Sequence, residues 1–217
     1  MLTENQTLMS RARESLRGKW GIVVGVTLVY YLITLIAGSP KALKIVGFII
    51  GGPLALGYQM FFLSLIRKKE VRFGMLFEGF NNFLTAFGAY VLVVVFVLLW
   101  MLLLIVPGII AGISYSLTWF IIADNPGIGS LEAIRKSKAM MQGHKMKLFH
   151  LTCRFWAWFL LGIVTAGIGF LWIGPYMIAA LTHFYQDLLD SQSGSETDGE
   201  EQVRTLPNDG TAPDAAV

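Results

Sequence analysis

His183 and Asp187 are the pair of residues whose types and spacing come closest to a chemical site in this chain. They are four residues apart, so on a helix both side chains project from one face. A carboxylate in that position can orient an imidazole for proton transfer or for metal binding. The alternative is a hydrogen bond at a helix interface, because two residues do not make a metal site. We therefore predict no catalytic residue, no metal and no cofactor.

Basic residues offer a second kind of chemistry, the binding of anionic groups. The candidate residues for binding lipid or a partner are Arg135, Lys136, Lys138, Lys145 and Arg154. Basic residues next to a membrane attract anionic head groups, at about 1 kcal/mol each. Arg154 follows the others inside an apolar run. It either extends its side chain to the membrane surface or faces inward to bind an anionic group.

The composition indicates the environment of these residues. The 217-residue chain is 55% hydrophobic and only 14% charged, against about 25% charged residues in an ordinary soluble domain. A single soluble core cannot bury so much apolar surface, so we predict a membrane protein. The composition excludes a secreted disulfide scaffold, a disordered chain and a free nucleic-acid-binding protein. The single cysteine, Cys153, excludes an intrachain disulfide.

Long runs without charge predict the membrane-embedded helices. No charged residue occurs at 79–123 or at 155–186, and each run is too long for one crossing of a ~30 Å hydrocarbon core. Together with the apolar region 21–66, they predict an all-α, polytopic fold with six spans in three helical hairpins. The expected spans are about 21–37, 45–66, 85–106, 109–123, 148–166 and 170–186. The fourth span is short, so one or two elements can instead dip into the membrane and return.

The distribution of positive charge predicts which side of the membrane each segment occupies. Thirteen lysines and arginines precede the hairpins or lie between them, whereas the hairpin tips carry only Lys41 and Lys44. A crossing hairpin and a re-entrant hairpin both return the chain to its starting face. We therefore expect the N-terminus, both long loops and the C-terminal tail on the cytoplasmic side.

The segments outside the hairpins have patterns of their own. Apolar residues recur every three or four positions at 9–20, 73–87 and 131–141, which predicts amphipathic helices on the cytoplasmic surface. These helices are either collars of the spans or a surface for lipid sensing or docking. Residues 1–190 thus form the expected membrane domain. Residues 191–217 contain six acidic residues and one arginine, and we predict a disordered acidic cytoplasmic tail there.

Short motifs along the membrane domain carry a family resemblance. They are Arg13-x-x-Leu16-x-Gly18-x-Trp20, Leu103-Leu104-Ile105-Val106-Pro107-Gly108-Ile109-Ile110-Ala111, Ala123-Asp124-Asn125-Pro126, Ser130-x-x-Ala133-Ile134-x-x-Ser137-x-x-Met140-Met141-x-Gly143-His144-Lys145-x-x-Leu148-Phe149, Gly167-Ile168-Gly169-Phe170-Leu171-Trp172 and Phe184-Tyr185-x-Asp187-Leu188. This set resembles the bacterial integral membrane family catalogued as domain of unknown function 975. The resemblance covers residues 13–188. It implies a multi-pass protein of the bacterial inner membrane, and it supplies neither a reaction nor catalytic residues.

Three classes of function follow, in order of preference. The first is a non-enzymatic membrane protein whose basic amphipathic helices bind anionic lipid head groups or a membrane-protein partner, including a second copy, and no nucleic acid. The second is a small transporter or channel-like protein, which needs polar groups along a central path, and the sequence has few. The third is a membrane-embedded lipid-modifying enzyme, which needs two converging titratable groups. Only His183 and Asp187 offer such a pair.

Overall fold

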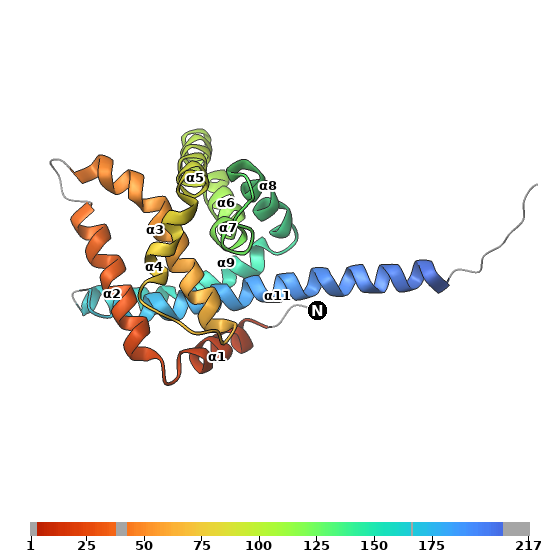
Figure 1. Ribbon diagram of the computed structural model, residues 1–217, viewed down its shortest axis with the longest axis horizontal. Helices are drawn as coiled ribbons and strands as arrows, with labels where there is room; N and C mark the ends of the chain where they lie inside the picture. Colours follow the sequence, from red (N-terminus) through yellow and green to blue (C-terminus); the bar gives the residue numbers. More distant parts are fainter. Residues whose placement is uncertain (1–3, 38–42, 166, 206–217) are drawn as a thin grey trace, which may run out of the picture.

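The computed structural model describes residues 4–37, 43–165 and 167–205, and within these ranges the protein is helical and has no strand (Figure 1). This confirms the all-α prediction. The helices are α1 (Asn5–Leu16), α2 (Trp20–Ala37), α3 (Leu43–Ile66), α4 (Met75–Glu78), the 3₁₀ helix η1 (Gly79–Asn82), α5 (Phe83–Leu103), α6 (Ile105–Tyr115), α7 (Thr118–Asp124), α8 (Ser130–Met140), α9 (Lys145–Arg154), α10 (Trp156–Val164) and α11 (Phe170–Thr205).

Four helical segments of the described chain are long and apolar enough to cross a membrane. They are Trp20–Ala37, Val46–Ile66, Met75–Leu103 and Val106–Asp124. These segments overlap the first four predicted spans, although the third begins ten residues before the predicted residue 85. The predicted spans 148–166 and 170–186 are not among them, so the six-span arrangement stays a prediction.

Two predicted spans are interrupted. The fourth, predicted at 109–123, consists of α6 and α7 with a break between them at Ser116 and Leu117. The hydroxyls of Ser116 and Thr118 donate to the carbonyls of Ile113 and Tyr115 respectively, at 2.8 and 2.7 Å, and such bonds compete with the helical ladder and bend helices. The fifth consists of α9 and α10, which have 10 and 9 residues. Each is about 15 Å long, half of a ~30 Å hydrocarbon core.

Helix α3 is the centre of the molecule, because it contacts α1, α2, α4, η1, α5, α7 and α11. Two glycines allow the chain to cross it closely. A Cβ at Gly57 would collide with the carbonyl oxygen of Leu76, and a Cβ at Gly79 would collide with that of Pro53. Only glycine therefore fits where α4 and η1 lie on α3.

The interior and the exterior of the molecule are both apolar. Phe61, Phe120 and Phe184 are completely buried where α3, α7 and α11 meet. Large apolar side chains are also exposed at the ends of the hairpins, including Leu35 on α2 and Leu102 on α5. A soluble monomer rarely exposes continuous apolar surface of this kind, whereas a lipid-facing surface requires it.

Helices α1 and α11 extend the body beyond the apolar hairpins. The apolar face of α1 is fully buried through Leu8, Ala12 and Leu16, and α1 packs mainly on α11. Helix α11 continues to Thr205 and leaves the body as a long single helix (Figure 1). The structure thus has helix at 191–205, in the first part of the segment expected to be disordered. Residues 206–217 lie outside the described residues.

Candidate functional site

The predicted polar pair on α11 holds α1 in place. Ser15 Oγ and His183 Nε2 share a hydrogen bond of 2.9 Å, and Arg11 Nη1 donates to Asp187 Oδ1 at 3.2 Å. The hydroxyl of Tyr176 adds a bond to the carbonyl of Met9 at 3.1 Å. In the part of the chain that the structure describes, no group of three His, Cys, Asp or Glu residues could hold a metal ion. The hydrogen bonds of Ser15, Arg11 and Tyr176 are thus contacts of the interface between α1 and α11.

Lys147 lies at the edge of the same interface. Asn5 Nδ2 donates to its carbonyl oxygen at 3.3 Å, and its ammonium lies 5.7 Å from the centre of the Phe184 ring. Among the described residues, neither Lys147 Nζ nor Asn5 Oδ1 has a hydrogen-bond partner, and both atoms are buried. This burial lowers the pKa of Lys147, although Asp187 opposes the shift. The ammonium group of Lys147 is therefore turned toward the protein, and the residue as a whole is partly buried.

A second polar cluster, which the sequence did not reveal, ties the ends of α3 and α7 to the middle of α11. Arg67 donates from both terminal nitrogens to Asp124, at 2.5 and 2.8 Å, and its Nε donates to Gln186 Oε1 at 3.2 Å. The hydroxyl of Tyr185 donates to Asp124 Oδ2 at 3.0 Å. The hydrogen bonds with Asp124 raise the pKa of Arg67. We call Arg67, Asp124, Tyr185 and Gln186 the clamp, since a bidentate arginine–carboxylate pair fixes geometry as well as charge.

The five candidate basic residues do not form one patch. Lys136 and Lys138 are both exposed on α8, but two helical positions turn them about 200° apart around the axis. Lys145 begins α9 and Arg154 ends it, so about 14 Å of helix separates them. Arg154 is exposed at a helix C-terminus, where a positive charge is favourable. Arg135 is exposed on α8 near the side that carries Lys138.

The structure brings Lys138 and Lys145 together at one cavity. The cavity has a volume of about 180 Å³, and α5 contributes Trp100 to its wall. Five residues of α6 between Pro107 and Tyr115 form most of the rest. One of them, Ser114, donates its hydroxyl to the carbonyl of Ile110. We call this space the lysine cavity.

The two lysines of this cavity have no ion-pair partner among the described side chains. The ion pairs Arg11–Asp187 and Arg67–Asp124 involve neither Lys138 nor Lys145. Two ammonium groups beside apolar and aromatic walls are complementary to an anionic amphiphile, with its charged group at the lysines and its hydrocarbon on the walls.

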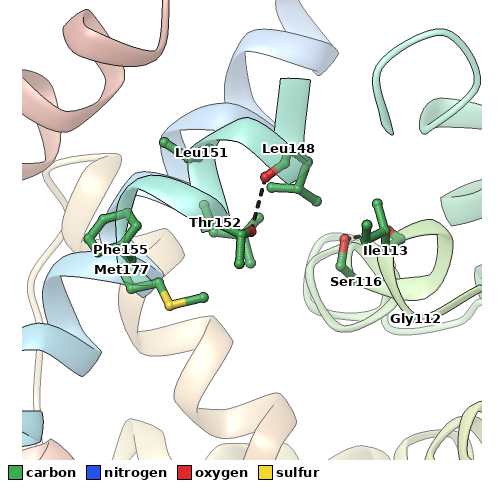
Figure 2. A pocket seen from close by; sticks show the side chains of 9 residues that line it. Gly112, Ile113, Ser116, Leu148, Leu151, Thr152, Phe155 and Met177 are labelled. Atoms are coloured by element: carbon green, nitrogen blue, oxygen red, sulfur yellow. Dashed lines mark hydrogen bonds between the residues drawn. The ribbon is translucent and has the colours of Figure 1, made fainter. Parts of the chain in front are cut away.

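A second cavity, also of about 180 Å³, lies on the opposite face of α6 (Figure 2). Figure 2 shows Ile113 of α6 and Ser116, which follows α6, across from Leu148 and Thr152 of α9. The hydroxyls of Ser116 and Thr152 donate to carbonyls of their own helices, at 2.8 and 3.0 Å. No charged residue lines this cavity within the described chain. It suits hydrocarbon rather than a polar ligand, so charge distinguishes the two cavities.

These features define an all-helical protein with four helices apolar enough to cross a membrane. The chain belongs to the family described as "Protein of unknown function (DUF975)", whose model matches residues 1–110 and 92–192. The match confirms the family resemblance found in the sequence motifs. No curated protein and no solved structure matches the chain.

Proposed function

We propose that this protein is a multi-pass protein of the bacterial inner membrane that binds anionic lipid head groups from its cytoplasmic side. The lysine cavity is the binding site. The observation that carries the proposal is the pair Lys138 and Lys145, which have no ion-pair partner in the described chain and share a cavity with apolar and aromatic side chains. The apolar helices that surround this cavity supply the membrane location.

Two contacts support a common side for the returning ends of the hairpins. The clamp joins Arg67, Asp124 and Gln186, which lie at or next to the ends of the second, fourth and sixth predicted spans. The bond between Arg11 and Asp187 brings the N-terminal helix to the beginning of the C-terminal extension. The excess of lysine and arginine in the same segments favours the cytoplasm for this side.

The energetic argument rests on charge at a membrane surface. A lysine near anionic lipid contributes about 1 kcal/mol, so two lysines at one head group predict a preference for anionic lipid of up to about thirtyfold. The apolar stems of both side chains can lie on the cavity wall while the ammonium groups remain at the head-group level. Arg135 extends the same positive surface along α8.

Lipid retention tests this proposal. The protein is purified from bacterial membranes in mild detergent, and the bound lipids are identified by native mass spectrometry. We expect wild type to retain phosphatidylglycerol or cardiolipin, and the double variant Lys138→Gln, Lys145→Gln to retain about tenfold less. The charge-matched control is Lys69→Gln, Lys136→Gln, which changes two exposed lysines outside the cavity and should retain lipid as wild type does. Equal retention by both double variants would refute the proposal.

A further inference from the structure

The tip of the α5–α6 hairpin is built entirely from apolar residues. From Trp100 to Gly108 the sequence has no polar side chain other than the indole of Trp100. Leu102, Leu103 and Leu104 expose 87%, 69% and 63% of their surfaces. A loop that emerged into water would not gain from such a surface. The tip is therefore suited to hydrocarbon.

The backbone at this tip is also suited to hydrocarbon. A single extended residue, Leu104, joins the two helices. Its N–H donates to the carbonyl of Trp100 at 3.0 Å, and the N–H of Gly108 donates to the carbonyl of Leu104 at 3.3 Å. Unpaired backbone groups are costly in a bilayer, and these two bonds pair the N–H and the carbonyl of Leu104, the residue that joins the helices. Gly108 permits the close approach, because a Cβ there would lie 2.5 Å from Met101 Cγ.

The distance from the lysine cavity to the tip along α6 limits how deep in the membrane the tip can lie. The α6 residues that line it begin at Pro107 and end at Tyr115, three to eleven positions after Leu104. These positions are about 5–17 Å from the tip along the helix axis. Half of a hydrocarbon core is about 15 Å. With the lysines at the head groups, the tip thus reaches no further than about the bilayer midplane.

We infer that the α5–α6 hairpin enters the membrane from the lysine side and returns to that side without crossing, with its tip among the acyl chains of one leaflet. This inference rests on the proposed function, which places Lys138 and Lys145 at the head groups. Helix α6 has 11 residues, about 17 Å, and the break at Ser116 and Leu117 separates it from α7, so α6 alone does not span a ~30 Å hydrocarbon core. The partner of this surface is a lipid monolayer.

Cysteine accessibility tests the inference. Cys153 is the only cysteine of the chain, so Leu104→Cys and Gln142→Cys are each introduced into a Cys153→Ser background. A membrane-impermeant maleimide is applied to intact spheroplasts and to inside-out vesicles. We expect Gln142→Cys, on the exposed connection between α8 and α9, to react in inside-out vesicles alone. We expect Leu104→Cys to react in neither, and to react fully in denaturing detergent, because a thiolate does not form in hydrocarbon.

Each other outcome overturns the inference. Labelling of Leu104→Cys in intact spheroplasts would show a hairpin that crosses, and labelling in inside-out vesicles would show a tip outside the membrane. If Leu104→Cys does not accumulate, Leu102→Cys replaces it, since Leu102 is 87% exposed. The labelling pattern reports topology and not lipid binding. Re-entry with no retained anionic lipid would refute the proposed function alone, and retained lipid with a crossing tip would refute this inference alone.

Discussion

The clamp and the lysine cavity use positive charge in opposite ways. In the clamp, Arg67 has a bidentate carboxylate partner and a third bond to an amide, and the surrounding helices are tightly packed. In the cavity, Lys138 and Lys145 have no ion-pair partner within the described chain. The difference is that paired charge joins helices in the clamp, whereas the lysines of the cavity have no such partner and, in our proposal, are available to an anionic ligand.

The clamp region is also more tightly packed than the region of the lysine cavity. Near the clamp, Phe120 stacks on Tyr185 with ring centres 5.2 Å apart, and both side chains are almost completely buried. Near the cavity, the tip of α5–α6 exposes its leucines. The packed region is stabilised by protein contacts, whereas we propose that lipid covers the hairpin. Four predictions test this contrast.

The largest expected effect comes from Gly79→Ala in the packed region. The new Cβ collides with the carbonyl oxygen of Pro53, so η1 must move away from α3, at a cost of about 3 kcal/mol or more. Gly112→Ala on α6 is the matched control, because nothing lies within 4 Å of its added Cβ. Unfolding by sodium dodecyl sulfate in mixed micelles measures both. Similar midpoints for the two variants would contradict the contrast in packing.

Asp124→Asn should have the next largest effect. It removes the charge that partners the guanidinium of Arg67, and the pair is partly buried, so we expect a loss of about 2 kcal/mol of unfolding free energy. Glu132→Gln on exposed α8 should change stability by less than about 0.5 kcal/mol. The same micelle titration applies. A wild-type midpoint for Asp124→Asn would show that the clamp does not stabilise the fold.

Salt should weaken lipid binding at the lysine cavity more than it weakens the clamp. Raising ionic strength from about 0.1 to 1 M shortens the Debye length from about 10 to 3 Å. We expect the lipid preference at Lys138 and Lys145 to fall severalfold, because these lysines act across an exposed cavity. The stability difference between wild type and Asp124→Asn should change little, because the clamp pair is in direct contact. Lipid retention and micelle unfolding at both salt concentrations check this. Equal salt sensitivity would remove the distinction.

Ser15→Ala should have the smallest effect. It removes the bond to His183, one of several that hold α1 on α11, and one such bond contributes about 1 kcal/mol. We expect faster amide hydrogen exchange in α1 alone, with global stability nearly unchanged. Ser10→Ala is the control, since the Ser10 hydroxyl bonds only to the carbonyl of Thr7 within α1. Exchange that rises throughout the chain would show that α1 does not open separately from the rest of the core.

Charge patterning predicts the ends of the first two spans well, whereas it predicts the end of α11 and the helix breaks poorly. The predicted span 21–37 is α2 to within one residue, and α3 ends at the predicted residue 66. The breaks at Ser116–Leu117 and at Phe155 carry no proline or glycine. Hydroxyl bonds and tertiary packing produce the first of them, and neither has a local sequence signal.

The candidate site could be predicted only in part for a related reason. The sequence identifies lysines of the third loop, but it treats them as one surface. Which of them meet depends on how α8 and α9 pack on α6. The clamp was not predicted at all, because 57 residues separate Arg67 from Asp124. Its residues stand at span ends, where charge is expected for topological reasons alone.

Quenching of Trp100 fluorescence tests the central claim most directly, because Trp100 lines the lysine cavity. The protein is reconstituted in phosphatidylcholine with either brominated phosphatidylglycerol or brominated phosphatidylcholine at equal mole fraction, and the signal of Trp100→Phe is subtracted. The account predicts stronger quenching by the anionic lipid, with a relative affinity of about 5–30 that falls close to one in Lys138→Gln, Lys145→Gln. Equal quenching of wild type by both lipids would contradict it.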